Sequence, residues 1–192
     1  MLSESSTDEP CLIADLGDAW LVNKPSGWLA HPQRGVDASS MTEWVGLNLG
    51  QGRAFPVHRL DRGTSGLMVW AKNSEGARRW QRAWQGGAVR KGYLAIVRGC
   101  VEKAQYVDHP VPGDEHGAKK TAQSMIRPLA TLDVEPRHVS LLEVEPYTGR
   151  YHQIRRHVKH LGHPLIGDSN YGRTELNRAF CRKFGLCRLA LH

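Results

Sequence analysis

The sequence has few cysteines and lacks any long apolar run. The cysteines are Cys11, Cys100, Cys181 and Cys187. They form no CxxC pair, which argues against a disulfide framework and against a zinc ribbon. No N-terminal apolar stretch with a cleavage site marks a signal peptide, and no run approaches the roughly 18 apolar residues of a membrane span. We therefore expect a soluble cytoplasmic protein with reduced thiols and no membrane partner.

Motifs of several enzyme classes are missing as well. The chain has no phosphate-binding P-loop and no GxGxxG dinucleotide motif. Thr64-Ser65-Gly66 offers hydroxyl groups, but it lacks the G-x-S-x-G context that exposes the nucleophile of a serine hydrolase. These absences argue against P-loop and dinucleotide sites and against serine-hydrolase chemistry.

The histidine pattern does not indicate a metal site. The clustered histidines are His152, His157, His160 and His163. Their spacing is irregular, whereas two histidines on one helix need i, i+4 spacing to bind a single metal ion. No acidic residue lies among them. We expect no metal, and the helical pattern of Ile154, His157 and Leu161 predicts that His157 is buried and hydrogen-bonded.

Acidic residues are fewer than basic ones. Lys and Arg number 26 against 19 Asp and Glu, so the formal net charge is +7 with the ten histidines neutral. Lys and Arg side chains bind polyanions because they neutralise phosphates and release counterions. The charge is compatible with any soluble basic protein, but it favours a nucleic-acid partner.

The length and the order of the predicted elements indicate an α+β protein. A chain of 192 residues is normally one domain with a single core, and it buries about 70% of the surface that its unfolded form exposes. We expect Met1–Pro10 to be a disordered lead-in and residues 11–192 to form that domain. Strands are predicted over 12–14, 19–23, 55–57, 67–71, 93–97 and 139–144, and helices over 40–50, 74–85, 151–161 and 175–184. Because these elements follow no regular βαβ alternation, the class is α+β.

Several ends of these elements carry recognisable signals. Ser40 and Glu43 have the spacing of a capping box. Thr174 and Gly185 are expected at the start and the stop of the last helix. The segment Asp108–Ser124 is rich in Gly, Pro, His and Lys, so we expect a loop or a hairpin there.

The run His58–Gly66 places one carboxylate between two arginines on a glycine-containing turn. The apolar segments on both sides are typical of strands, so Asp61 is expected at the lip of a sheet. Gly63 and Gly66 supply backbone freedom where a side chain would obstruct a bound ligand. The spacing alone leaves two readings of Asp61 open, a functional carboxylate or a turn residue that hydrogen-bonds nearby amides.

This run and several others resemble the motifs of the RluA-type pseudouridine synthases. His58–Leu67 is similar to the HRLDxxTSGL signature of that family, and Lys91–Gly99 is similar to its K-x-Y-x-A-x-V-x-G strand. The remaining matches are Asn23–Gly27 to NKPxG, Thr148–Arg155 to TGRxHQIR, and Gly162–Gly172 to GHPIxGDxxYG. Since the motifs occur in family order, the chain is identified as a member of this family over residues 21–192.

The resemblance implies both a fold and a reaction. The implied fold is the family's catalytic domain, a bent, mixed but mostly antiparallel sheet with flanking helices and a basic cleft. Members isomerise uridine in RNA to pseudouridine: the N-glycosidic bond breaks, the base turns while held, and it rejoins the ribose through carbon 5. The implied partner is RNA, and no metal or organic cofactor is implied.

The resemblance also implies roles for single residues. Asp61 matches the catalytic aspartate, which must be ionised whether it adds to ribose C1′ or removes a 2′ proton. Arg155 matches the arginine that pairs with this aspartate and favours its charged form. Tyr93 matches the tyrosine that stacks on the target base, and Arg59 matches the residue that fills the stack left by the flipped nucleotide. Candidate phosphate contacts are Arg62, Lys119, Lys120, Arg150 and Arg156.

The residues by themselves leave other readings open. Without the resemblance, Arg155 reads as a surface arginine of an amphipathic helix. In the same way, the strand pattern alone is compatible with Tyr93 as a core aromatic.

The tail of the chain resembles a branch of the family that acts on a T-arm uridine of tRNA, through Ser169–Gly172, Asn177-Arg178 and Phe184–His192. Relatives continue past the segment that resembles Arg188–His192, so we expect either a fragment or a chain that lacks the family's last strands. We also expect no separate N-terminal RNA-binding module, which favours a structured RNA such as tRNA as the substrate. The alternatives are a synthase acting on rRNA and a catalytically idle RNA-binding module of the same fold. We expect a monomer.

Overall fold

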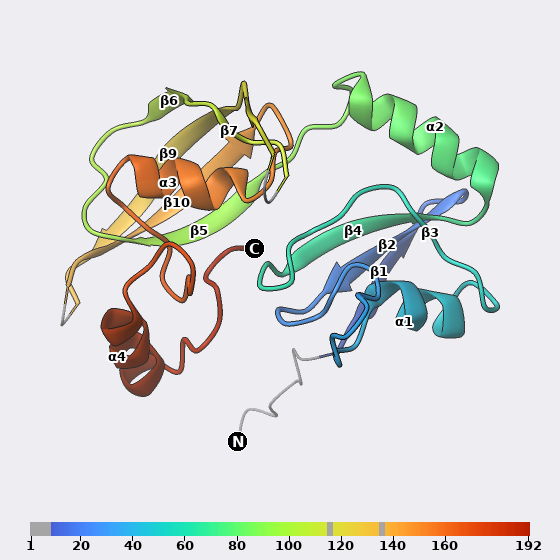
Figure 1. Ribbon diagram of the computed structural model, residues 1–192, viewed down its shortest axis with the longest axis horizontal. Helices are drawn as coiled ribbons and strands as arrows, with labels where there is room; N and C mark the ends of the chain where they lie inside the picture. Colours follow the sequence, from blue (N-terminus) through green and yellow to red (C-terminus); the bar gives the residue numbers. More distant parts are fainter. Residues whose placement is uncertain (1–8, 115–116, 135–136) are drawn as a thin grey trace. The chain divides into compact units, whose positions relative to one another are not determined.

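The chain folds into two compact units. The structure is a computed structural model, and it describes residues 9–114, 117–134 and 137–192 (Figure 1). The units are Met1–Val89 and Arg90–His192. Each unit has its own sheet and its own buried cluster of apolar side chains, whereas the sequence predicted a single core. The strands of each four-stranded sheet come from one unit.

The N-terminal unit is built on a four-stranded antiparallel sheet. Its strands are β1 (Cys11–Asp15), β2 (Ala19–Lys24), β3 (Phe55–Pro56) and β4 (Gly66–Ala71), in the order β1-β2-β4-β3. The helices of this unit are α1 (Met41–Asn48) and α2 (Ser74–Gln85), which lie on opposite sides of the sheet in Figure 1. Trp80 and Trp84 of α2 pack against a buried cluster that includes Val69 of β4. The long loop between β3 and β4 carries Asp61.

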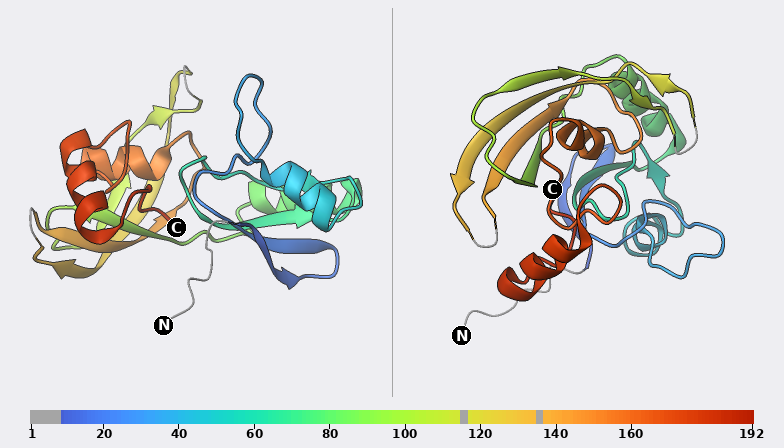
Figure 2. Two further views of the ribbon diagram at one scale, coloured as in Figure 1. Left: turned by 90° about the horizontal axis from the view of Figure 1, so that it is seen from below. Right: turned by 60° about the vertical axis from the view of Figure 1, so that its left-hand side comes forward.

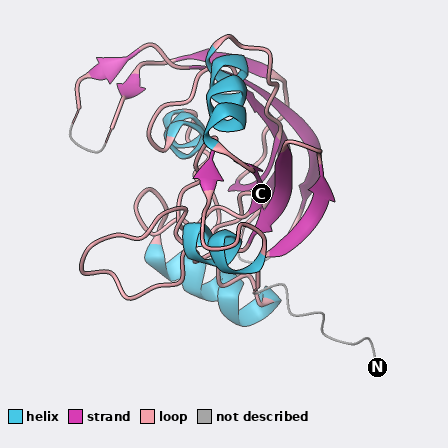
Figure 3. Cartoon of the chain, turned by 90° about the vertical axis from the view of Figure 1, so that its right-hand side faces the viewer, coloured by secondary structure: helices cyan, strands magenta, loops and turns pink. Residues whose placement is uncertain are grey.

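The C-terminal unit has a second antiparallel sheet. Its strands are β5 (Tyr93–Arg98), β6 (Gln105–Asp108), β9 (Gln123–Leu132) and β10 (Val139–Pro146), in the order β5-β10-β9-β6. This sheet curves about α3 (Gln153–His160), as Figure 2 shows. The remaining elements are the hairpin strands β7 (Val111–Pro112) and β8 (Lys119–Lys120) and the helix α4 (Thr174–Phe184). The hairpin extends away from the four-stranded sheet (Figure 3).

The outer edge of β5 is closed by two separate segments of the chain. Near the start of the strand, Leu94 exchanges backbone hydrogen bonds with His192, and the amide of Ile96 donates to the carbonyl of Ala190. Further along, the carbonyl of Ile96 accepts from the amide of Ile166, and the amide of Arg98 donates to Pro164. Residues 190–192 therefore behave as strand partners.

The α+β class and most helix positions are confirmed. The capping box is present, since Ser40 Oγ accepts from the amide of Glu43 at 3.3 Å and donates to its carboxylate at 2.5 Å. The N-cap of α4 is Arg173, and it makes no side-chain capping bond, so the assignment of Thr174 to that position is wrong. The stop at Gly185 is confirmed. No helix of the described residues is long and apolar enough to cross a membrane.

The sequence patterns did not predict β6 and β9. The longer strand, β9, contains Pro128, and proline cannot donate a hydrogen bond to a neighbouring strand. The structure tolerates it because β6 pairs only with the part of β9 before Pro128. A register shift opposite Leu141 and Leu142 leaves Leu129 as the extra residue of a bulge.

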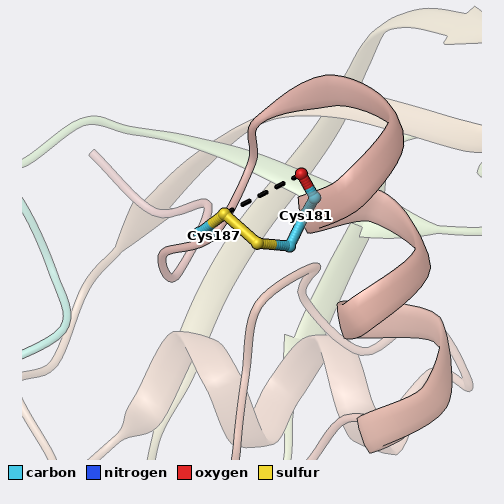
Figure 4. The surroundings of a disulfide bond; sticks show 2 residues. All are labelled: Cys181 and Cys187. Carbon is cyan, nitrogen blue, oxygen red and sulfur yellow. Dashed lines mark hydrogen bonds between the residues drawn. A yellow bond between two sulfur atoms is a disulfide. The ribbon is translucent and has the colours of Figure 1, made fainter.

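Cys181 and Cys187 form a disulfide at the end of α4. Their Cα atoms lie 4.4 Å apart (Figure 4), so the expectation that all thiols are reduced is wrong for this pair. The dashed line in Figure 4 is a contact between Cys187 Sγ and the carbonyl of Cys181, because an oxidised sulfur has no proton to donate. Cys11 and Cys100 are free and exposed. Sequence spacing did not reveal the bridge, because it depends on how α4 ends.

We predict that the disulfide stabilises the folded state of the oxidised protein. Closing so short a loop lowers the entropy of the unfolded chain, which is worth about 2 kcal/mol. Cys187→Ser should therefore lower the free energy of unfolding by about that amount in urea titrations without reductant. With dithiothreitol the wild type should fall to the stability of the variant, while Cys100→Ser should change nothing. Equal stability of wild type and Cys187→Ser without reductant would contradict the prediction.

Candidate functional site

The predicted site residues are divided between the two units. Arg59, Asp61 and Arg62 belong to the N-terminal unit. The other six, all of the C-terminal unit, are Tyr93, Lys119, Lys120, Arg150, Arg155 and Arg156. The pairing of Asp61 with Arg155 and the basic cleft stay predictions, and the surroundings of each group are described within its own unit.

The Asp61 loop is held by the turn that follows β2. The amide of Gly27 donates to the carbonyl of Arg62 at 2.8 Å, and Ser26 Oγ donates to the carbonyl of Gly63 at 2.7 Å. In return, Arg62 Nε donates to the carbonyl of Gly27 at 3.0 Å. Three hydrogen bonds thus fix the backbone directly after Asp61 against a turn that is distant in sequence. They also occupy one N–H of Arg62, a candidate phosphate contact.

The local backbone around Asp61 is a tight turn. The amide of Thr64 donates to the carbonyl of Asp61 at 3.1 Å. Gly66 begins β4 with φ 131°, a conformation that a residue with a Cβ rarely adopts. The side chain of Asp61 is half-buried and that of Arg59 is exposed. Asp61 therefore lies within the loop between β3 and β4, and its expected place at the lip of a sheet stays a prediction.

Lys24 is a buried cation next to this loop. Its side chain is fully buried, and Nζ donates to the carbonyl of Pro25 at 2.9 Å and to that of Arg62 at 3.1 Å. Burial lowers the pKa of Lys24 to about 8, against the opposing charge of Asp61, which raises it. Lys24 stands in the Asn23–Gly27 motif, but sequence reasoning gave it no role. The fold assigns it one, since its ammonium bridges the turn and the Asp61 loop.

Arg155 lies on α3 in a buried bidentate ion pair with Asp168. Arg155 Nε and Nη2 donate to the two carboxylate oxygens, each at 2.8 Å. Both residues are buried, with 7% and 1% of their surfaces exposed. Burial alone raises the pKa of Asp168, but the hydrogen bonds and charge of Arg155 and the amides of Tyr171 and Asn170 outweigh it, so the pKa lies below its ordinary value. The reading of Arg155 as a surface arginine is therefore wrong.

A histidine and a tyrosine also lie against Arg155. Arg155 Nη1 donates to His152 Nε2 at 2.8 Å, so the proton of this imidazole resides on Nδ1, which lies 3.2 Å from the hydroxyl of Tyr171. The guanidinium also lies over the Tyr171 ring, 5.1 Å from its centroid. Burial raises the pKa of Tyr171 against the lowering effect of Arg156 and Arg155. The plane of Arg155 is thus set from several sides.

The other basic residues of this unit have more varied surroundings. Arg150 Nε donates to the carbonyl of Thr121 at 3.1 Å, directly after the exposed Lys119 and Lys120 of the hairpin. Three predicted phosphate contacts therefore gather near one segment. Arg156 is half-buried against Tyr171, and its Nε finds no hydrogen-bond partner among the described residues.

Tyr93 begins β5 and is partly buried against the core cluster of its unit.

Of the histidines, His157 is fully buried between Ser124 Oγ at 3.1 Å and the carbonyl of His109 at 3.0 Å, as predicted. Burial lowers the pKa of His157. The described residues contain no group of three or more side chains arranged to hold a metal ion.

Comparison with known proteins identifies the family. The family model described as RNA pseudouridylate synthase matches residues 18–160. A tRNA pseudouridine synthase C from Haemophilus ducreyi is 37% identical over 189 residues, which cover 89% of this chain and 77% of that protein. One of the same name from Vibrio cholerae is 39% identical, over 89% of this chain and 78% of its own length.

Solved structures share the fold. The human RNA pseudouridylate synthase domain containing 1 matches with a TM-score of 0.80 at 24% identity, over 97% of this chain and 77% of that one. The human domain containing 4 has a TM-score of 0.74 at 22% identity, over 94% and 81%.

The chain therefore belongs to the RNA pseudouridylate synthase family, and the resemblance to its RluA-type members is confirmed. It is an isomerase of the kind that converts uridine in RNA to pseudouridine.

The burial of Lys24 predicts a pH dependence of stability. Below pH 8 the ammonium is charged in both the folded and the unfolded chain, and the folded state bears the full desolvation penalty. Between the folded pKa of about 8 and the ordinary lysine pKa of 10.5, the unfolded chain holds more protons, so stability rises with pH. In urea titrations, the free energy of unfolding of the wild type should rise by about 3 kcal/mol relative to that of Lys24→Met across this pH range.

The exposed Lys103 provides the control, and Lys103→Met should keep the pH profile of the wild type. Parallel profiles for wild type and Lys24→Met would show that Lys24 titrates alike in both states, against this prediction.

Asp168→Asn should leave the charge of Arg155 buried without its counterion. We expect a loss of about 3–5 kcal/mol in the free energy of unfolding at pH 7. Because the folded pKa of Asp168 is depressed, the difference from wild type should shrink as the pH falls below the unfolded value of about 3.9. Asp133→Asn, at an exposed aspartate paired with His138, should cost little. An equally small loss for both variants would refute the role of Asp168.

Proposed function

We propose that this chain converts a uridine of tRNA, in the T arm, into pseudouridine, and that it acts as a monomer. Support for tRNA comes from relatives named tRNA pseudouridine synthase C, which match about nine tenths of the chain. The observation that carries the proposal is the construction of the Asp61 loop. Its backbone is fixed by Lys24, Ser26 and Gly27, while its carboxylate is only half-buried.

The reaction exchanges one bond of C1′ for another. The bond from C1′ to N1 of the uracil breaks, the base turns, and C1′ bonds to C5. C5 then gives up its proton, and N1 receives one. Asp61 is the carboxylate that we propose to act at the ribose, by adding to C1′ or by removing the 2′ proton. In either route it must be ionised, and the site must exclude water, since hydrolysis would release the uracil.

Three further side chains have proposed roles. Arg155 is proposed as the cation that favours the ionised form of Asp61, and its rigid setting against Asp168 suits it to this task. Tyr93 is proposed to stack on the uracil. Arg59, exposed two residues before Asp61, is proposed to fill the gap in the base stack, where a planar guanidinium offsets part of the few kcal/mol that flipping costs.

The hairpin region is the proposed phosphate-binding surface. Lys119 and Lys120 are exposed, and Arg150 is held beside them through Thr121. Arg62 and Arg156 are proposed as additional contacts. Such contacts set the orientation of the RNA and contribute affinity without selecting sequence.

Asp61→Asn should abolish the reaction and spare RNA binding. The substrate is unmodified tRNA carrying tritium at C5 of its uridines, because that hydrogen is lost to water only when C5 bonds to C1′. Wild type without added metal should release tritium, and Asp61→Asn should lower the rate by at least about 1,000-fold with tRNA affinity within about threefold. Mapping of the modified position then tests the T arm.

Asp37→Asn, at an exposed aspartate of the same unit, is the matched control and should keep full activity. Tritium release by Asp61→Asn at the wild-type rate would remove Asp61 from the mechanism. Binding of tRNA by wild type without any release would instead indicate the catalytically idle RNA-binding module.

A further inference from the structure

The turn that carries Asp168 is held by a side chain of α4. Asn177 Oδ1 accepts from the amide of Gly167 at 3.0 Å, and Asn177 Nδ2 donates to the carbonyl of Asp168 at 2.9 Å. The side-chain amide of Asn177 thus hydrogen-bonds the backbone on both sides of the peptide bond between Gly167 and Asp168. The two contacts fix where the Cα of Asp168 lies and which way its side chain leaves the backbone.

The same turn is enclosed by backbone on other sides. Gly167 has φ 76°, and a Cβ there would lie 1.9 Å from the carbonyl oxygen of Arg188. A Cβ on Gly172 would lie 2.4 Å from the carbonyl oxygen of Asp168. Close packing of this kind leaves the turn little freedom on these sides.

Asn177 is itself anchored by its helix. Phe180, one turn of α4 further on, is only 3% exposed and packs in a buried cluster with Ile166 and Ala190. Contacts therefore run without a break from the core, through Asn177 and the Gly167–Asp168 peptide, to the carboxylate that meets Arg155 on both of its oxygens.

We propose that Asn177 is a positioning residue for Arg155, acting through Asp168. The inference rests on the proposed function, in which the task of Arg155 depends on the direction of its guanidinium. Loss of the Asn177 contacts lets the Asp168 turn shift, and the guanidinium follows it. Small displacements of groups around a reacting centre lower the rate of the chemical step far more than they lower binding.

The kinetic test compares two asparagines close to Asp168. Asn177→Leu removes both hydrogen bonds and keeps the branching of the side chain, and it should lower kcat for tritium release about tenfold with KM for tRNA within about twofold. Asn177→Asp keeps the acceptor for Gly167 but turns a carboxylate oxygen toward the carbonyl of Asp168, so it should lower kcat as well. Asn170→Ala removes an exposed side chain. The backbone amide at this position still donates to Asp168, so the variant should keep the wild-type kcat. Unchanged kcat in Asn177→Leu would overturn the proposal.

A second measurement separates positioning from general loosening. If Asn177 acts through Arg155, then Asn177→Leu should cause little further loss of kcat in an Arg155→Lys background. Independent, multiplying losses would overturn the proposal. Should Asn177→Leu fail to fold, Asn177→Asp takes its place in both tests.

The proposal and the proposed function can fail separately. Hydrogen exchange of Arg155 Nε–H, followed by NMR, needs no substrate, and that proton is protected by Asp168 in the wild type. Exchange should be about tenfold faster in Asn177→Leu than in Asn170→Ala. An inactive wild type with this difference would defeat only the proposed function, whereas equal exchange rates would defeat the positioning role.

Discussion

A buried guanidinium needs a partner that matches its charge and its shape, and in the C-terminal unit Asp168 is that partner for Arg155. The bidentate geometry fixes the guanidinium in its plane as well as in its position. Many other features of the unit serve the carboxylate. The turn supplies two backbone amides to it, α4 holds the turn, and the depressed pKa keeps the carboxyl ionised. Removing one partner of such a pair lowers the free energy of unfolding by several kcal/mol. Replacing both partners with apolar residues of similar size changes it far less.

The N-terminal unit handles its buried charge differently. Lys24 has backbone carbonyls as its hydrogen-bond partners, and Asp61 acts on it through its charge. Carbonyl dipoles solvate an ammonium without neutralising it, so the positive charge remains available to favour a negative charge nearby. The side chain of Asp61, whose charge acts on this cation, is only half-buried. The cost appears in the lowered pKa of the lysine.

The sequence predicted the parts of the molecule that depend on local patterns. Helices with a capping box or a glycine stop were placed correctly, and the Asp61 turn was found because glycines and flanking strands mark it. Elements that depend on distant partners were missed. Pro128 hid β9, since only the pairing with β6 and β10 shows that its missing N–H falls on an edge. The disulfide depended on where α4 ends.

The same distinction applies to the candidate site. Asp61, Arg155 and Tyr93 came from motif resemblance, and their catalytic roles stay predictions. Lys24 and Asp168 lay within the matched motifs but received no role, because a motif does not say which side chain turns inward. The signals were available in retrospect: a lysine at the end of an otherwise buried strand and an aspartate after a glycine in a tight turn. Asn177 entered only through the resemblance of the tail and received no role, since only the fold brings α4 to the Gly167–Asp168 peptide.

The closure of the β5 edge has a consequence for the folding of the chain. Leu94 and Ile96 direct backbone groups outward until the segments around Ile166 and Ala190 arrive. Those segments follow a long stretch of sequence, so their pairing is a high-contact-order event that comes late. During synthesis on the ribosome, an unfinished chain therefore exposes a ready template for any other extended polypeptide. That template is covered only after the segments around Ile166 and Ala190 have left the ribosome.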